Sequence, residues 1–538
     1  MKSKLFFLFF LIVVISGIVF ATNPKIIKQV STYFEKKEEK RTIKRVTIPT
    51  YYKLWKDEQK TDSLLPQDLI ETTTSNSGKL FVNNHKGYKL EVPANWEVNN
   101  NQYSVFTKFY TKDFSMNVFV QDVAPMWMST RQYIDNTVEN LKAYHLTKET
   151  KIISGKRYIK YMYNRPLNTK IKGDLNKYTY YFYSSGHYVY TFHLKYSNDQ
   201  YLTAFENSLK TFKTINKTKI TNVDIKNSLS NLEMKKINFK GDKASFKIQT
   251  DQNVVGIYRM KATDLDNKND PHYKKVGAQL LYYGLNSPYD PYLDTMYMKK
   301  RIPFVTLLFN ARKVSSVNIN ERIINGEFDK NLYTWAKNVK KAGYPILFRL
   351  GNEMNGKWEG SNASYSYNDT DLYKLAYRHI VNIFRTSGAT NAKFIWNPNG
   401  GNDPGFDWNE AEMYYPGDKY VDVIGMTVYN FGQTKYGKFT QYDDLFTDVY
   451  KDYLLSFGNK PMMVGETGSV ELGGDKSKFI TDMLTETPKL YPNVRMMVYF
   501  DAVHDPYDFE INTSAKSDQA FIEGMNSPNI IFGIKKSK

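Results

Sequence analysis

From residue 254 onward, short apolar runs alternate with polar residues and amphipathic stretches. Eight runs are present, and each is apolar at successive positions, as is typical of strands that are buried on both faces. Residues 331–343 and 371–388, which lie between runs, have helical periodicity and end in glycine, as helix C-termini prefer. Eight strand–helix units in about 285 residues predict an α/β fold, a (β/α)8 TIM barrel, within residues 235–538. The runs begin at residues 254, 278, 303, 345, 393, 422, 461 and 495.

An open, doubly wound sheet is the alternative for the same alternation. Such a sheet normally has a glycine-rich phosphate-binding turn after its first strand. The residues that leave the first run here, GIYRMKATD at 256–264, do not form one. The pattern therefore favours the barrel.

Residues 78–215 follow a different pattern, in which apolar and polar positions alternate with a period of two. Their β-branched and aromatic content predicts strands with one solvated face. Helical stretches at 128–144 and 199–209 interrupt the strands, so we expect a small α+β domain. The order of GYKLEVPANWEV, a following sheet and FENSLKTFK resembles the PsbP/MOG1-like accessory domains of exported proteins. No catalytic cluster is visible in this region, which predicts a binding or spacer role.

The N-terminus predicts export. Two lysines precede 17 uncharged residues, Leu5 to Ala21, a length between that of a signal-peptide core and that of a spanning helix. Residues 1–24 are therefore expected to be a cleaved signal peptide or a retained membrane anchor. Residues 25–77 are charged and polar without apolar periodicity, and we interpret them as a tether. Either alternative places the folded part outside the cytoplasm, secreted or anchored to the outer face of the membrane.

The formal net charge of +19 is concentrated in the N-terminal part. Residues 1–234 hold 35 Lys and Arg against 20 Asp and Glu, or +15, and the remaining 39 and 35 leave residues 235–538 at +4. No RNA-binding or helix-turn-helix pattern accompanies the basic part, so nucleic acid is not an expected partner. An anionic wall polymer or a membrane surface fits it better, and a solvated charged face is the simplest explanation. The chain has no cysteine, which excludes disulfides and thiolate metal sites.

Two glutamates stand just past apolar runs, Glu353 after the fourth and Glu466 after the seventh. TIM barrels assemble their chemistry at the carboxyl ends of the strands. A glutamate that directly follows a buried strand is partly desolvated and needs partners, so a structural ion pair is the alternative for either one alone. Two at one barrel mouth match the carboxylate pair of a glycosidase, which needs no metal and no cofactor.

Five segments of the chain occur in the order typical of one enzyme family. They are PILFRLGNEMNGKW, LAYRHIVNIFRTSGATNAKFIWNPN, YYPGDKYVDVIGMTVYNFG, KPMMVGETGS and VYFD. Together they resemble glycoside hydrolase family 26, the endo-β-mannanase family. The resemblance runs from about residue 254 to residue 521. It implies that Glu353 is the acid/base and Glu466 the nucleophile of a retaining enzyme. It also places Arg349 and Tyr429 beside the nucleophile and makes Trp358 a sugar-stacking residue.

Other positions refine the expected site. Trp396 offers a face for a pyranose ring, although it could equally cap the core. Tyr499 stands where the family commonly has tryptophan, and it is expected in the substrate site. Asn352 replaces the histidine that usually precedes the acid/base, and asparagine is the residue that related barrels use to bind the sugar 2-hydroxyl. This departure leaves the reaction class intact and puts mannan itself in doubt.

These features predict a retaining endo-β-glycosidase that hydrolyses an extracellular polysaccharide, either β-mannan-like or β-glucan. One alternative is an inactive barrel that binds polysaccharide at the cell surface. Another is that the basic N-terminal part is the functional unit and recruits the barrel to an export or assembly machine. The presence of both glutamates favours the enzyme.

Overall fold

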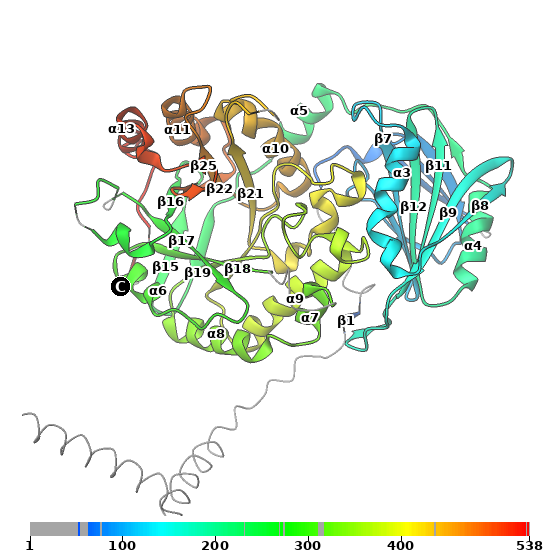
Figure 1. The fold of residues 1–538 in the computed structure, drawn as a ribbon, viewed down its shortest axis with the longest axis horizontal. Coiled ribbons are helices and arrows are strands. Elements are labelled where there is room, and N and C mark those ends of the chain that lie inside the picture. The colour runs from blue at the N-terminus through cyan, green and yellow to red at the C-terminus, as the bar shows by residue number, and fades with distance from the viewer. Residues whose placement is uncertain are drawn as a thin grey trace, which may run out of the picture. The chain divides into compact units, whose positions relative to one another are not determined.

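The computed structural model describes one compact unit within residues 49–538. The described residues are 52–53, 63–75, 78–230, 232–267, 269–272, 275–309, 317–434, 437–533 and 535–536. Two regions are evident, a barrel and a strand-rich domain that precedes it in the sequence (Figure 1). The predicted signal or anchor, residues 1–24, lies outside the described residues. Within those residues, none of the helices combines the length and apolar character needed to cross a bilayer.

Eight parallel strands close into a barrel, as the sequence predicts. Pairing of the first strand with the last closes the ring, with Val254 opposite Met496. Each strand coincides with one of the eight apolar runs, because its side chains face either the barrel interior or the surrounding helices and neither face meets water. The strands are β16 (Val254–Tyr258), β17 (Ala278–Gly284), β18 (Ile302–Leu308), β19 (Ile346–Leu350), β20 (Ala392–Trp396), β21 (Val423–Asn430), β22 (Met462–Ser469) and β23 (Val494–Phe500).

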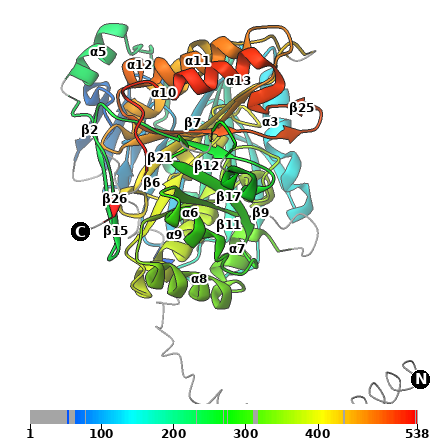
Figure 2. The same ribbon diagram turned by 90° about the vertical axis from the view of Figure 1, so that its left-hand side faces the viewer.

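Helices lie outside the strands (Figure 2). The two helices expected at residues 331–343 and 371–388 are α8 and α9, and Gly343 follows α8 in the left-handed conformation at φ 71°. The alternation is less regular elsewhere, since the described residues between β20 and β21 form only short 3-10 turns. The α-helices are α6 (Tyr292–Met298), α7 (Ile319–Ile324), α8 (Asp329–Ala342), α9 (Thr370–Thr386), α10 (Tyr442–Phe457), α11 (Lys476–Thr485), α12 (Thr487–Leu490) and α13 (Ala515–Gly524). The 3-10 turns are η3 (Ala262–Asp266), η4 (Ala363–Tyr365), η5 (Asp407–Asn409), η6 (Ala411–Tyr414), η7 (Asp418–Tyr420) and η8 (Ile511–Thr513).

The preceding domain is α+β and is built on a seven-stranded antiparallel sheet, in the order β5-β6-β7-β12-β11-β9-β8. A second sheet has the order β13-β4-β3-β2, and aromatic side chains such as Trp96 and Phe114 fill the core. The large sheet comprises β5 (Glu97–Asn99), β6 (Thr107–Tyr110), β7 (Phe114–Asp122), β8 (Thr147–Ile153), β9 (Lys156–Asn164), β11 (Lys177–Ser185) and β12 (Tyr188–Tyr196). The second comprises β2 (Ile70–Thr74), β3 (Lys79–Asn83), β4 (Tyr88–Val92) and β13 (Lys213–Thr214), and the helices are α3 (Thr130–Val138), η2 (Glu139–Tyr144), α4 (Gln200–Leu209) and α5 (Asn222–Ser230). Outside these sheets lie η1 (Gln67–Leu69), β1 (Tyr52–Lys53), β10 (Ile171–Lys172), β14 (Ile237–Lys240), β15 (Ala244–Ile248), β24 (Val503–His504), β25 (Tyr507–Asp508) and β26 (Lys535–Lys536).

The folded part begins earlier than the predicted end of the tether at residue 77. Strand β2 pairs with β3, and the backbone N–H of Leu64 donates to the carbonyl of Leu455 at the end of α10. Leu65 is buried beside Leu455 and Tyr103. These few apolar side chains, scattered in a polar stretch, had no periodicity that would reveal the strand.

The polar face of the seven-stranded sheet is not solvated, contrary to the sequence-based expectation. Its central strands carry Lys195, which is buried and forms ion pairs with Asp369, at 2.9 Å, and with Asp371, both at the start of α9. Lys108 and Lys374 also contact Asp371. Burial opposes ionisation of Asp371, but the three lysines outweigh it and hold its pKa well below the usual range. The alternating pattern identified a polar face correctly, and the barrel supplies acidic groups that cover it.

Removing one cation from this buried cluster should destabilise the protein. Lys195→Met leaves two buried aspartates short of positive charge, so we expect the free energy of unfolding to fall by about 3–5 kcal/mol. The matched control is Lys177→Met in the same sheet, because the Lys177 ion pair with Asp199 is largely exposed. The control should change stability by less than about 1 kcal/mol. Urea titration of both variants measures the difference in unfolding free energy. Equal losses of stability in the two variants would contradict a stabilising role for the buried cluster.

Candidate active site

Glu466 lies inside β22, whereas the sequence placed it just past the strand. The register between β21 and β22 shifts here: Val464 pairs with Met426 and Glu466 pairs with Thr427, so that Gly465 is an extra residue. Such bulges re-aim side chains and occur often beside active sites. Gly465 must lack a side chain, because a Cβ there would lie 1.7 Å from the side-chain oxygen of Asn397. The bulge therefore sets the direction of the Glu466 carboxylate.

Three donors hold the Glu466 carboxylate. Arg349 of β19 donates from Nη2 to Oε2 at 2.6 Å, and the hydroxyl of Tyr282 from β17 donates to the same oxygen. The hydroxyl of Tyr429 from β21 donates to Oε1 at 2.5 Å. Glu466 is 5% exposed and Arg349 is fully buried, so the ion pair is shielded from solvent. One cation and two hydroxyls match the negative charge of Glu466.

Arg349 is itself held on every side. Nε donates to the hydroxyl of Thr306 at 2.8 Å, and Nη1 donates to the carbonyl of Gly465 at 3.3 Å and to the side-chain oxygen of Asn397 at 3.4 Å. Nη2 also donates to the Tyr282 hydroxyl at 3.0 Å. A buried guanidinium with all its N–H groups satisfied has little freedom to move away from Glu466.

Glu353 lies just past β19, as predicted, in a backbone conformation that ordinary residues rarely adopt, with φ 54°. Its N–H donates to the carbonyl of Asn397 at 2.8 Å, which anchors the turn to the neighbouring strand end. Its Oε2 accepts a hydrogen bond from the indole N–H of Trp358 at 2.7 Å. Gly356 allows this approach, because a Cβ there would lie 2.3 Å from the Trp358 ring.

The two carboxyl groups therefore have different environments. Burial raises the pKa of Glu353, and the negative charge of Glu466 raises it further, to about 7. The Trp358 hydrogen bond and the positive charge of Arg349 lower that pKa by a smaller amount. Glu353 can thus keep its proton near neutral pH while Glu466 is paired with a cation. A pair of carboxyls whose environments differ in this way is the arrangement that glycoside hydrolysis requires.

Part of the chain matches a known protein family. Residues 306–520 match the profile of glycosyl hydrolase family 26. The barrel is a family 26 glycosyl hydrolase domain. The strand-rich domain that precedes it lies outside the matched residues.

Curated relatives cover part of this chain. Endoglucanase H of Acetivibrio thermocellus is 32% identical over 241 residues, which are 44% of this chain and 26% of that protein. A mannan endo-1,4-beta-mannosidase of Bacillus subtilis is 28% identical over 187 residues, 33% of this chain and 44% of that protein. This chain thus spans between a quarter and a half of the length of these relatives. Among solved structures, a GH26 beta-mannanase from Bacteroides ovatus is 18% identical with a TM-score of 0.39, covering 52% of this chain and 90% of that one.

Within the family 26 domain, most of the predicted site residues come together. Arg349 and Tyr429 contact Glu466, and Trp358 contacts Glu353. Asn352 is buried, and its side-chain oxygen accepts no hydrogen bond from any described residue.

Trp396 is not in the site, contrary to the prediction. It is fully buried and packs against Tyr415 and against Tyr453 and Phe457 of α10. Successive side chains of a strand point to opposite faces. Trp396 therefore faces the helices, and the next residue, Asn397, faces the barrel interior and contacts Arg349.

Tyr499 was also expected in the substrate site, and it does not lie there. It is fully buried, its hydroxyl donates to the carbonyl of Ser469, and its ring lies 6.3 Å from Phe521 of α13. The following residue, Phe500, is partly exposed and lies near the site, with ring centroids 4.7 Å from Tyr258 and 5.9 Å from Tyr429.

Sequence reasoning missed Tyr282 as well as Phe500. Tyr282 and Tyr283 are adjacent in β17, and only Tyr282 reaches Glu466, while Tyr283 packs against Trp335. The available signal was their place at the carboxyl end of the second run. A continuously apolar run does not reveal which of two neighbours faces the interior.

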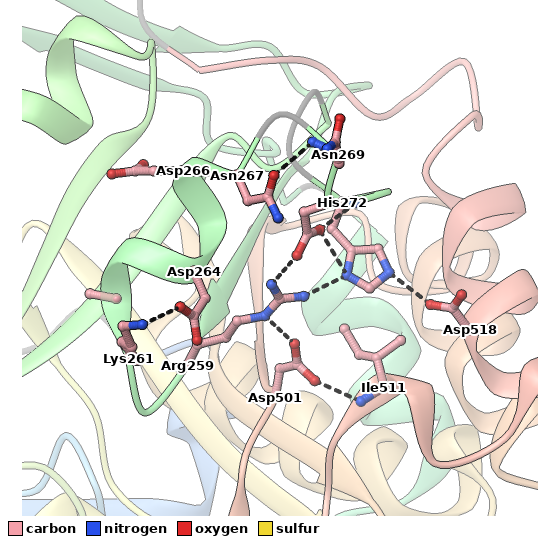
Figure 3. Close-up of polar contacts among 12 residues, drawn as sticks. Arg259, Lys261, Asp264, Asp266, Asn267, Asn269, His272, Asp501, Ile511 and Asp518 are labelled. Carbon is pink, nitrogen blue, oxygen red and sulfur yellow. Dashed lines mark hydrogen bonds and ion pairs between the residues drawn. The ribbon is translucent and has the colours of Figure 1, made fainter.

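A polar network fixes the segment after β16 (Figure 3). Arg259 donates from Nε to Asp501, which follows β23, at 2.5 Å, and also contacts Asp270. Its Nη2 lies 2.7 Å from Nδ1 of His272, whose Nε2 lies 3.0 Å from Asp518 of α13. This network ties the first loop of the barrel to its last strand. Among the described residues, no group of three or more His, Asp and Glu side chains is placed to hold a metal ion.

The raised pKa of Glu353 should make stability depend on pH. Between the ordinary pKa of 4.5 and about 7, folded Glu353 keeps a proton that the unfolded chain has released, so its contribution falls as pH rises. Glu353→Gln removes this loss. We expect the variant to melt at a higher temperature than wild type at pH 8.5 and at nearly the same temperature at pH 4.5, measured by calorimetry.

Glu471 supplies a control in which the pKa is shifted in the opposite direction. Burial raises its pKa, but hydrogen bonds from Ser517, Ser514 and Thr513 outweigh burial and lower it overall. Its contribution to stability is present above the ordinary pKa and is lost as pH falls. Glu471→Gln should therefore lower the melting temperature at pH 8.5. A Glu353→Gln variant that behaves like Glu471→Gln would contradict the raised pKa.

Proposed function

We propose that the family 26 domain hydrolyses a β-linked polysaccharide as a retaining endo-glycosidase. The observation that carries this proposal is the pair of glutamates with different environments, Glu353 just past β19 and Glu466 in the carboxyl-terminal half of β22. Glu466, which is paired with Arg349, is the nucleophile, and Glu353, whose pKa is raised to about 7, is the acid/base.

The first step forms a covalent glycosyl-enzyme. A carboxylate oxygen of Glu466 attacks the anomeric carbon, the bond from that carbon to the glycosidic oxygen breaks, and Glu353 gives its proton to the departing oxygen. Neutralising Glu466 as an ester removes the charge that raised the pKa of Glu353. Glu353 is then a stronger acid, and its carboxylate can accept a proton.

The second step releases the sugar. Water attacks the anomeric carbon, the ester bond to Glu466 breaks, and Glu353 takes the water proton. The regenerated carboxylate again accepts hydrogen bonds from Arg349, Tyr282 and Tyr429. The unpaired side-chain oxygen of Asn352 is available to accept a hydrogen bond from a sugar hydroxyl, and the half-exposed Trp358 holds Glu353 in place.

The substrate we propose is a β-glucan or a β-mannan. The relatives bear both names, endoglucanase and mannan endo-1,4-beta-mannosidase. Asn352, in place of the expected histidine, weakens the case for mannan. We also propose that the enzyme acts outside the cell, because of the uncharged run from Leu5 to Ala21; protease accessibility in intact cells tests this.

The full-length chain should be screened against mixed-linkage β-glucan, glucomannan, galactomannan and xylan. Proton NMR of the first product resolves the anomeric configuration, and a retaining mechanism gives the β-anomer first. It also requires the two carboxyls to lie about 5–5.5 Å apart in an experimental structure. Binding without hydrolysis would instead identify an inactive polysaccharide-binding barrel, and the α-anomer as first product would exclude the covalent intermediate.

The roles of the two glutamates can be separated with an activated aryl glycoside of the substrate sugar. Glu466→Ala should abolish turnover, because no glycosyl-enzyme can form. Glu353→Ala should still react at Glu466, since an activated leaving group needs no proton, and should lose about 10² to 10⁴ in rate on the polymer.

Azide provides the diagnostic readout. It should restore turnover of Glu353→Ala with a β-glycosyl azide as product, because azide replaces the water that Glu353 no longer activates. Tyr429→Phe serves as a structural control that removes one hydrogen bond from Glu466 and should lower the rate without becoming responsive to azide. An α-glycosyl azide from Glu353→Ala, or a β-glycosyl azide from Glu466→Ala, would show that the roles are assigned wrongly.

A further inference from the structure

Trp127 is the most exposed large apolar side chain among the described residues, at 97% of its full exposure. It lies between β7 and α3 in the segment VAPMWMST, residues 123–130. Tryptophan is rarely left so open to water on a monomeric protein, since its burial would stabilise the fold. Its φ of 52° is also a conformation that side-chain-bearing residues seldom adopt.

The segment that carries Trp127 is rigidly built. The N–H of Ala124 donates to the Asp122 carboxylate at 3.0 Å, and the N–H of Trp127 donates to the carbonyl of Ala124 at 3.2 Å. Ser129 and Gln132 form a reciprocal capping box that starts α3. The surrounding bonds therefore fix an unusual backbone conformation that holds the indole outward.

The elements on either side of this segment, β7 and α3, contact loops at the catalytic face of the barrel. In a TIM barrel that face is formed by the loops after the strands. The side-chain oxygen of Gln121 in β7 accepts from the N–H of Asp407, in the loop after β20, at 2.8 Å. The ring of Tyr133 in α3 lies edge-on to Phe406 of the same loop, at 5.0 Å.

The loop after β19 is fixed to the same element. The side chain of Asn368 donates to the carbonyl of Thr137 in α3 at 2.8 Å. The loop after β19 carries Glu353, and the loop after β20 is joined to it where the N–H of Asp403 donates to the carbonyl of Asn355 at 2.9 Å. The two elements that flank Trp127, β7 and α3, therefore contact two barrel loops, one of which carries the acid/base.

We propose that Trp127 is a distal polysaccharide-binding platform, on which a sugar ring of the polymer stacks while another part of that chain occupies the cleft. The proposal rests on the proposed function, because the cleft must take a polymer long enough to extend beyond it. A flat indole suits the apolar face of a pyranose, and the exposed Ser129 and Gln132 beside it offer hydrogen-bonding groups to the sugar hydroxyls. The preceding domain thus contributes to substrate binding through its position.

The charge around Trp127 favours a neutral polymer over a membrane. Residues 123–135 contain one cation, Arg131, which is paired with Asp135 at 3.7 Å. A membrane-surface anchor draws its affinity from apolar insertion together with several basic residues that attract anionic lipid. Trp127 has the apolar group without such residues.

The test compares Trp127→Ala with Ile152→Ala, a control in the same domain, because Ile152 is also an exposed apolar residue but lies on the edge strand β8. Binding is measured in a Glu466→Gln background, so that the polymer is not cleaved, by affinity electrophoresis in mixed-linkage β-glucan and in glucomannan. We expect Trp127→Ala to weaken binding about five- to tenfold and Ile152→Ala to leave it unchanged. Trp127→Tyr should recover part of the loss, since tyrosine retains a flat ring.

Kinetics in the otherwise unaltered enzyme separate this proposal from the proposed function. Trp127→Ala should raise KM on the polymer and leave kcat/KM on a short aryl glycoside unchanged, with an unaltered melting temperature. Polymer hydrolysis that is equal in Trp127→Ala and wild type would overturn the platform while leaving the enzyme intact. Absence of hydrolysis by wild type would refute the proposed function alone, because the binding assay does not depend on it. Unchanged polymer binding with lost binding to phosphatidylcholine–phosphatidylglycerol vesicles would identify a membrane contact instead.

Discussion

The ion pair between Arg349 and Glu466 is the constraint around which the barrel mouth is built. Taking both charges out of water costs several kcal/mol per ion, and their attraction compensates only if every remaining polar group is satisfied. Thr306, Asn397, Tyr282 and the carbonyl of Gly465 complete the guanidinium contacts. Two glycines make this possible, because a Cβ at Gly425 or Gly465 would collide with Asn397. Residues on five different strands thus form or accommodate the ion pair between Arg349 and Glu466.

The same pair explains why Glu353 differs from Glu466. Arg349 binds Glu466 directly and acts on Glu353 only at longer range, where it lowers the pKa less than burial and Glu466 raise it. Burial is the larger cause of the raised pKa of Glu353, and the negative charge of Glu466 adds to it. The charge of the proposed nucleophile thus also helps its neighbour to keep a proton. The strained turn at Glu353 belongs to this arrangement, since the N–H of Glu353 is bound by the carbonyl of Asn397, whose side chain contacts Arg349.

Much of the fold could be predicted because burial on two faces gives a distinctive pattern. The eight apolar runs coincide with β16 to β23, and the positional rule for barrels was enough to select Glu353 and Glu466. The same pattern explains the errors. In a run that is apolar throughout, nothing marks whether a residue faces the interior or the helices, so Trp396 and Tyr499 were assigned to the wrong side while Tyr282 was overlooked. Only side-chain contacts show which of two neighbouring residues faces the barrel interior. Trp396, for example, packs against the helices, whereas Asn397 contacts Arg349 inside the barrel.

The sheet of the preceding domain shows a further limit of reading periodicity as solvation. Its alternation separates an aromatic core from a polar face, and a polar face on an isolated domain would be wet. Here that face is covered by the start of α9, and Lys195 is neutralised by Asp369 and Asp371, which belong to the barrel. Without the barrel, Lys195 would lose both of its carboxylate partners, and without the preceding domain, Asp369 would lose its ion pair with Lys195. These ion pairs fix the position of the preceding domain beside the loops that carry the proposed chemistry.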